Sequence, residues 1–381
     1  MKIALGVPSD LGKTKYSGFN VAFQQVLSAL SGHETIVFAP GGGDIRLHAE
    51  PVDTGFKSRY LNTMALSRDF AERVTRFSPD VILAFTNMGL FLDRDFIYYT
   101  SNVPYKRVLQ LVAGEYPENT HFSALLNHYK FVAGQEAANY EKAEHIVVLS
   151  HMIREAIVTE HGIDPDKITY LPRYIPKLQD QPIYMQSQSE FPHSRSSSRK
   201  MQIILMPAQL RVMKGIRYAV ETMKILKKEM NNAVLVICGS FNAYEHDYVK
   251  SLLHDAKGKA NIVVTGYLPR DKYYGYLRNA ECAFMPFCFD ECPISLSECI
   301  GSGLPVVTNE YAGYSEPVIN TFGYCADYKN VEDYADALMK MLSDREYNKV
   351  KRDGCRTITE AFSLDKFREN LQRVVTRSGK A

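Results

Sequence analysis

Residues 285–308, MPFCFDECPISLSECIGSGLPVVT, carry the most informative pattern in the chain. The end of an apolar strand is followed by an acidic loop, by Pro293 at a helix entry and by a short helix. A Gly-x-Gly turn then leads into the apolar strand LPVVT. Free backbone N–H groups at the start of such a helix favour an anion. The stretch therefore predicts two strands with an anion-binding helix between them.

Two acids bracket the start of this helix. Asp290 and Glu298 stand eight residues apart, and the backbone N–H groups from Ile294 to Leu296 lie between them. A carboxylate can accept two hydrogen bonds from vicinal hydroxyls, which suits the recognition of a ribose or a hexose. The arrangement offers amides for a diphosphate and acids for sugars.

Short apolar runs alternate with helical patterns over the rest of the chain. Continuous apolar strands separated by helices predict parallel sheets that are covered on both faces. Each half opens with a strand, a loop and a helix, so we expect two doubly wound sheets with ligands at the carboxyl ends of their strands. The runs lie at 2–7, 34–38, 81–85, 106–112, 145–149, 202–206, 233–238, 261–265, 282–285 and 304–308.

The predicted fold class is α/β, with two Rossmann-like domains that face each other across a cleft. The first domain is expected over 1–178 and the second over 201–362. Residues 179–200, QDQPIYMQSQSEFPHSRSSSRK, are polar and rich in serine, as is typical of a linker. A terminal amphipathic helix is expected over 363–381, and it could pack back on the first domain.

Composition narrows the class of protein. The chain has 381 residues, of which 45% are hydrophobic and 23% charged, and this is a globular composition with ample core. A formal net charge of +2 argues mildly against a nucleic-acid partner. The seven cysteines are odd in number and all follow residue 237, which favours free thiols in a reducing compartment such as the cytoplasm. No cysteine pair has the C-x-x-C spacing of a zinc site, and no run of 18 apolar residues predicts a membrane span.

The run from Asp290 to Val306 resembles the acid-x7-acid signature of retaining glycosyltransferases of family 4, which have the GT-B fold. That family usually shows an E-x-F-G/P-x-x-x-x-E-A-x-A-x-G-x-P-V pattern. The resemblance implies that Asp290 is a catalytic residue that holds the hydroxyls of the donor sugar, and that Glu298 binds the ribose of the nucleotide. The diphosphate would rest on the helix that follows Pro293, at the N–H groups of Ile294, Ser295 and Leu296.

Further landmarks of the family follow in the same order along the chain. Residues 207–215, PAQLRVMKG, resemble its G-R-L-x-x-x-K-G loop, which places Lys214 on the diphosphate as a catalytic cation. The family's arginine is replaced by Gln209, and Arg211 could supply the charge instead. The remaining matches are Gly18 in a loop near the donor phosphate, Gly239 at a strand end, Tyr267 and Leu268 in a turn against the base, and Gly313 and Glu316 in a G-x-x-E turn.

Two departures from the family affect the expected chemistry. Asp290 stands where glutamate is usual, which shortens the reach to the sugar by one methylene. Many members carry a histidine near the anomeric carbon, which we expect after the strand predicted at 106–112. In VLQLVAGEY the nearest polar side chains are Gln110 and Glu115.

The resemblance implies a retaining hexosyltransferase that needs no metal and no cofactor. The donor would be a UDP- or GDP-linked sugar, and the acceptor a glycan, a lipid-linked or another small acceptor. The protein would be cytoplasmic, with room for peripheral contact with a membrane surface. Two alternatives remain: a catalytically silent protein that binds nucleotide sugars, and a sugar-nucleotide epimerase or hydrolase on the same scaffold.

Several other patterns have a structural explanation as well as a functional one. Asp93-Arg94-Asp95 and Asp164-Pro165-Asp166 resemble a metal-binding D-x-D motif, but capping and turn roles fit them better. The triple glycine at 41–43 lacks the lysine of a P-loop, so a loop is the better interpretation. The aromatic stretch 89–105, GLFLDRDFIYYTSNVPY, could line an acceptor groove, touch lipid or be buried packing.

Overall fold

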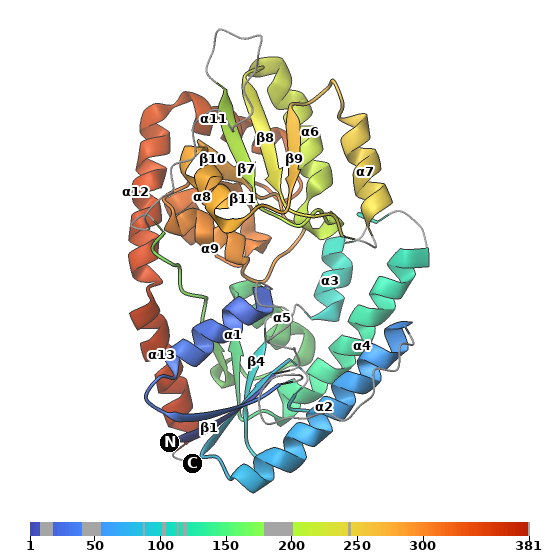
Figure 1. Cartoon of the computed structure of the whole chain (residues 1–381), viewed down its shortest axis with the longest axis vertical. Helices are drawn as coiled ribbons and strands as arrows, with labels where there is room; N and C mark the ends of the chain where they lie inside the picture. The colour runs from blue at the N-terminus through green and yellow to red at the C-terminus, as the bar shows by residue number, and fades with distance from the viewer. Residues whose placement is uncertain are drawn as a thin grey trace. The chain divides into compact units, whose positions relative to one another are not determined.

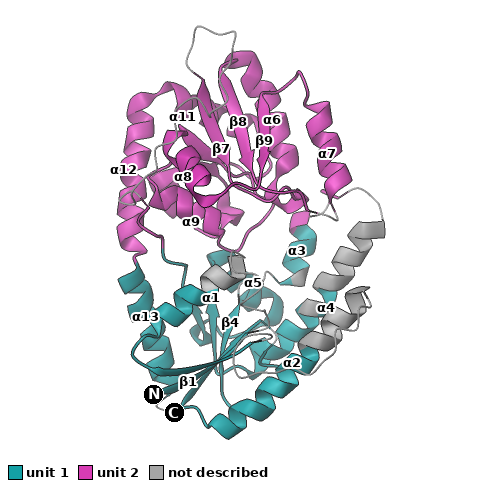
Figure 2. Ribbon diagram, viewed as in Figure 1, with its two compact units in different colours: residues 1–110, 119–174, 364–381 teal, residues 111–118, 175–363 magenta. Residues whose placement is uncertain are grey.

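The computed structural model forms two compact units, which Figure 2 distinguishes by colour. The first consists of Met1–Gln110, Asn119–Tyr174 and Leu364–Ala381, and the second of Leu111–Glu118 and Ile175–Ser363. The residues that the structure describes are 1–7, 18–39, 55–86, 88–100, 104–112, 114–116, 120–178, 201–242 and 245–379.

The first unit contains a six-stranded parallel sheet in the order β2-β1-β3-β4-β5-β6. Every residue of β3 is buried, as expected for a parallel strand in a doubly wound sheet. The strands are β1 (Lys2–Gly6), β2 (Glu34–Phe38), β3 (Val81–Phe85), β4 (Ile97–Thr100), β5 (His145–Val148) and β6 (Ile168–Tyr170). The helices are α1 (Gly18–Ala29), α2 (Gly55–Phe77), α3 (Tyr105–Val112), α4 (Thr120–Lys142), α5 (His151–His161) and α13 (Leu364–Ser378).

The second unit repeats this plan with the strand order β12-β11-β10-β7-β8-β9, again all parallel. Helix α6 packs on β8 and α11, and α11 packs on β10 and β11 (Figure 1). The strands are β7 (Gln202–Met206), β8 (Ala233–Cys238), β9 (Ile262–Gly266), β10 (Cys282–Phe284), β11 (Val306–Thr308) and β12 (Gly323–Cys325). The helices are α6 (Ile216–Glu229), α7 (His246–Asp255), α8 (Arg270–Asn279), α9 (Ile294–Gly301), α10 (Glu316–Phe322), α11 (Val331–Ser343) and α12 (Arg345–Ala361).

The prediction of a strand at 106–112 is wrong, because this segment forms α3. Val108, Leu111 and Val112 are buried at helical spacing, while Lys106 and Gln110 are exposed. The strand lies earlier, as β4, inside the aromatic stretch 89–105. In β4 and just before it the aromatic side chains are buried, so this part of the stretch packs in the core.

The remaining predicted strands are confirmed to within two residues at their ends. Leu111–Glu118 lie inside the range predicted for the first domain, yet they belong to the second unit. The terminal helix α13 belongs to the first unit, where it packs on α1. The linker predicted over 179–200 and the triple glycine at 41–43 lie outside the described residues.

In the described part of the chain, no helix combines the length and the apolar character that crossing a membrane requires.

Candidate functional site

The winding of the second sheet changes direction between β7 and β10. Strands β8 and β9 lie on one side of β7, whereas β10, β11 and β12 lie on the other. In sheets of this kind ligands bind at the carboxyl ends of the strands where the winding changes. The segments that leave the sheet at this point are 207–215 after β7 and 285–293 after β10, and these two segments hold Lys214 and Asp290.

The two loops are held together by direct backbone contacts. The Cys288 N–H donates to the Met213 carbonyl oxygen at 3.0 Å. Gly215 lies against the Pro286 carbonyl oxygen so closely that a Cβ at position 215 would lie 1.7 Å from it. Gly215 also has φ +74°, a left-handed conformation that glycine adopts readily. The glycine of the K-G pair is therefore required by packing and by backbone conformation together.

Lys214 and Asp290 form an ion pair at this junction. Lys214 Nζ donates to Asp290 Oδ2, and the ammonium also lies 5.1 Å from the centre of the Phe287 ring. Asp290 is only 7% exposed, and its backbone N–H donates to the Tyr311 carbonyl oxygen at 2.8 Å. The structure thus brings together the two residues for which the sequence predicts catalytic roles.

Glu298 lies on α9, and α8 supplies its partners. The Tyr273 hydroxyl donates to Glu298 Oε2 at 3.0 Å, and Arg270 Nη2 lies 3.7 Å from Glu298 Oε1. Burial raises the pKa of Glu298, and the Tyr273 hydrogen bond and the Arg270 charge oppose that rise. Neither partner was predicted from the sequence, because no spacing rule connects residues of α8 with a residue of α9.

Helix α9 begins after Pro293, which provides no side-chain cap. The Leu296 N–H donates to the Pro293 carbonyl oxygen at 3.1 Å, so that amide is already engaged. In the part of the chain that the structure describes, the N–H groups of Ile294 and Ser295 have no backbone acceptor. The predicted diphosphate seat therefore rests chiefly on two amides instead of three.

Arg211 is paired with Glu245, a buried residue just before α7. Arg211 Nε lies 3.3 Å from Glu245 Oε1, and the Val212 N–H donates to Glu245 Oε2 at 2.5 Å. This pair fixes the backbone just before Lys214. Arg211 was predicted from the sequence as a substitute for the missing arginine, whereas Glu245 was not predicted. Gln209, in the position of that arginine, is exposed.

The glycine at the end of β8 and the turn after β9 complete this edge of the sheet. A Cβ at Gly239 would lie 2.0 Å from the Ala208 carbonyl oxygen, so Gly239 lets two loops approach closely. Tyr267 is 72% exposed, and Leu268, next to it, is half-buried. In the first unit Gly18 begins α1, and residues 8–17 before it lie outside the described part of the chain. The role of Gly18 therefore stays a prediction.

The histidine near the anomeric carbon was expected after a strand at 106–112, but this segment is α3. The strand before it is β4, and residues 101–103 after β4 lie outside the described residues. Glu115, named as one of the nearest polar side chains, is a buried member of the second unit instead.

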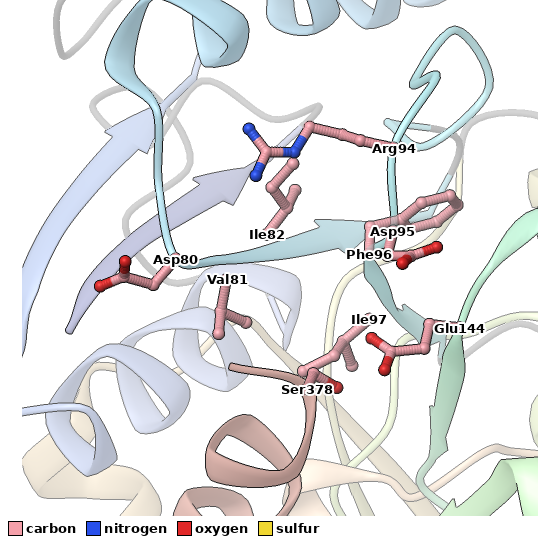
Figure 3. Close-up of a pocket in the computed structure, with 9 residues that line it drawn as sticks. All are labelled: Asp80, Val81, Ile82, Arg94, Asp95, Phe96, Ile97, Glu144 and Ser378. Atoms are coloured by element: carbon pink, nitrogen blue, oxygen red, sulfur yellow. The ribbon is translucent and has the colours of Figure 1, made fainter. Parts of the chain in front are cut away.

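A cavity of about 190 Å³ lies in the first unit, at the amino ends of the strands β3 and β4 (Figure 3). Its lining includes Val81 and Ile97, which begin β3 and β4, and the acids Asp80, Asp95 and Glu144. The amino ends of parallel strands are not the ligand-binding edge. Asp80 moreover accepts a hydrogen bond from the Lys2 N–H at 2.7 Å, which is a structural role.

The described residues contain no cluster of three or more His, Cys, Asp or Glu side chains that could hold a metal ion. The seven cysteines are free thiols. Burial raises the pKa of Cys282, Cys288 and Cys355 to about 12, so these thiols stay protonated near neutral pH.

The raised pKa of Glu298 predicts a pH dependence of stability. The folded chain holds this proton more tightly than the unfolded chain, so the stabilising contribution is full below the ordinary glutamate pKa. It is lost as the pH rises through the raised folded value. We expect the thermal midpoint of Glu298→Gln, taken relative to that of the wild type, to increase as the pH rises over this window. Parallel pH curves for the two proteins would contradict the assignment.

Residues 187–354 match the family model described as glycosyl transferases group 1. A curated relative, poly(glycerol-phosphate) alpha-glucosyltransferase of Bacillus subtilis (strain 168), is 24% identical over 165 residues. That alignment covers 43% of this chain but only 24% of the relative, so the chain spans about a quarter of that protein.

Two solved structures cover almost the whole chain. WaaG, a glycosyltransferase involved in lipopolysaccharide biosynthesis, aligns with a TM-score of 0.72 at 16% identity, over 99% of this chain and 100% of its own. Sucrose-phosphate synthase from Thermosynechococcus elongatus aligns with a TM-score of 0.76 at 15% identity, over 99% and 98%. These likenesses confirm the predicted fold class. The chain has the GT-B fold, and its residues 187–354 are similar to the group 1 glycosyl transferases.

Proposed function

We propose that the chain is a retaining hexosyltransferase of family 4 that uses a UDP- or GDP-linked sugar and needs no metal. The observation that carries the proposal is the Lys214–Asp290 pair at the change of winding, just before the uncapped start of α9. A cation, free helix amides and an acid are the groups that a sugar diphosphate requires. The acceptor would be a glycan or a lipid-linked or other small acceptor.

Transfer breaks the bond between the anomeric carbon and the diphosphate oxygen and forms a bond from that carbon to the acceptor oxygen. Negative charge grows on the departing diphosphate, which takes up the proton of the acceptor hydroxyl. Lys214 and the N–H groups of Ile294 and Ser295 would stabilise that charge. Such fixed charges and dipoles can do this work without a divalent cation.

Donor binding would exchange the partners of the ion pair. Lys214 would turn from Asp290 to a phosphate oxygen, and Asp290 would accept hydrogen bonds from sugar hydroxyls. Glu298 would accept hydrogen bonds from the ribose, with Tyr273 holding the carboxylate in place. Both acids thus keep hydrogen-bond partners in the free and the bound protein.

The activity for which the Bacillus subtilis relative is named supports retention. That protein is an alpha-glucosyltransferase, and an α-product from an α-linked nucleotide sugar has the configuration of its donor. Its acceptor, a poly(glycerol phosphate), supports a phosphate-bearing or polyol-bearing acceptor for this chain.

Nucleotide binding is the first test of the proposal. We expect one of UDP, GDP, ADP, CMP or dTDP, or a matching nucleotide sugar, to raise the thermal midpoint by several degrees with or without magnesium. A ligand at a hundred times its Kd adds about 2.7 kcal/mol, enough for such a shift. Glu298→Ala should lose the shift, whereas Glu360→Ala, an exposed acid on α12, should keep it.

The outcomes separate the rival functions. If none of the nucleotides or nucleotide sugars shifts the thermal midpoint, the transferase proposal is overturned. A shift without transfer or donor consumption would favour a silent binding protein, and donor consumption without an acceptor would favour a hydrolase or epimerase. A shift that requires magnesium would contradict metal independence.

A further inference from the structure

A buried cluster of charged and polar groups lies beside the donor loops without taking part in the mechanism above. At its centre is Glu115, which is 4% exposed. Glu115 Oε1 accepts a hydrogen bond from the Tyr218 hydroxyl at 2.5 Å and lies 2.8 Å from Lys329 Nζ. The partners come from α6 and from the turn before α11. The short segment that carries Glu115 is thus held by distant parts of the second unit.

The same turn also binds the end of α3. Lys329 Nζ donates to the Leu111 carbonyl oxygen at 3.1 Å, and the Tyr328 hydroxyl donates to the same oxygen at 2.9 Å. The last carbonyl groups of a helix lack partners within the helix, so these two donors satisfy one of them. Glu115 is therefore fixed through its side chain, and Leu111 through its backbone carbonyl.

Lys329 adopts a backbone conformation that is unfavourable for its type. Its φ is +63°, in the left-handed region that costs free energy for any residue except glycine. Such a conformation persists where the surroundings determine it, and it often marks a functional site. Here it accompanies the contacts of the ammonium with Glu115 and Leu111.

Two tyrosines of the cluster, Tyr218 and Tyr328, connect it with the proposed catalytic residues Lys214 and Asp290. Tyr218 lies on α6, three residues after Gly215 and four after Lys214. The ring of Tyr328 packs against the ring of Tyr311 at 4.5 Å between centres. The carbonyl oxygen of Tyr311 in turn accepts the hydrogen bond from the Asp290 N–H.

We propose that Glu115 and Lys329 are positioning residues for the transfer reaction. Leu111 and Glu115 form a brace that holds the Lys214 loop through Tyr218 and the Asp290 loop through Tyr328 and Tyr311. The role in transfer rests on the proposed function, whereas the brace itself is a property of the fold. Small misplacements of a catalytic group are costly, so a brace of this kind affects rate more than nucleotide binding.

The test uses the full chain and compares two tyrosines. Tyr328→Phe removes the hydroxyl that binds Leu111 and keeps the ring on Tyr311. Tyr324→Phe is the matched control, since it removes a hydroxyl that binds Asp333 Oδ1 at 2.9 Å in the same unit. Glu115→Gln is the second brace variant, because it removes the charge while retaining an acceptor for Tyr218.

Amide hydrogen exchange is measured first, because it needs no activity. We expect the Asp290 and Cys288 amides to exchange on the order of tenfold faster in Tyr328→Phe and Glu115→Gln than in the wild type or in Tyr324→Phe. We also expect both brace variants to lower kcat by about tenfold or more, with Kd for UDP or GDP within about twofold.

Each result decides one part of the proposal. Unchanged exchange at Asp290 and Cys288 in both brace variants would overturn the brace, whatever the activity. Faster exchange with unchanged kcat would overturn the positioning role. If the wild type transfers no sugar from any donor, the proposed function fails, and the exchange result still decides the brace.

Discussion

Replacing Lys214 by alanine is expected to lower the rate of sugar transfer by about 10²–10³-fold, the loss typical when one group that stabilises developing charge is removed. The ammonium stands at the change of winding, paired with Asp290 and just ahead of the uncapped start of α9. The control is Lys224→Ala. Lys224 lies on α6 with a side-chain exposure of 25%, against 22% for Lys214, and it pairs with Glu221.

The ion pair allows stability and activity to be separated. Lys214→Ala leaves the buried Asp290 carboxylate without its cation, which should lower the thermal midpoint. Adding Asp290→Asn removes the unpaired charge, so the double variant should recover stability without recovering activity. Its rate should be near that of the slower single variant, because groups that act as a unit do not lose rate additively. Restored transfer in the double variant would show that the pair is structural.

The parallel sheets were predictable because strand runs such as VILAF (81–85) and AVLVIC (233–238) are too short and too apolar for surface helices. The conformation of segment 106–112 was not predictable, since KRVLQLV has apolar residues at both strand and helix spacings. Whether it forms a strand or a helix depends on which of its residues the tertiary fold buries. The real strand, IYYT, is only four residues long and lies within an aromatic stretch.

The residues of the candidate site also divide into those that the sequence predicts and those that it does not. Lys214, Asp290 and Glu298 were found because each lies in a local pattern whose spacing follows from a strand, a loop and a helix. Tyr273, Glu245 and Lys329 were missed, because each meets its partner only through the tertiary fold. Sequence separations of 25 residues for Tyr273 and Glu298, and of 34 for Arg211 and Glu245, leave no local signal.

Gly215→Ala is expected to destabilise the second unit far more than the matched substitution Gly258→Ala. Both glycines are left-handed, with φ of +74° and +78°, so an alanine costs about 1–2 kcal/mol at either position. At Gly258 the added Cβ meets nothing within 4 Å, whereas at Gly215 it would lie 1.7 Å from the Pro286 carbonyl oxygen. Overpacking of this kind adds typically about 1–3 kcal/mol or more.

The difference between the two variants isolates the close approach of the two loops, because the backbone strain is common to both. A unit of this size loses about 2–4 °C of thermal midpoint per kcal/mol, so the two midpoints should differ by several degrees. Relief of the clash must move Pro286 away from Gly215, and Lys214 then no longer faces Asp290. Gly215→Ala should therefore also lose the nucleotide-induced shift at temperatures where it is folded. Equal midpoints for the two variants would mean that the loops can separate freely, and the paired site would then not be preorganised by its backbone.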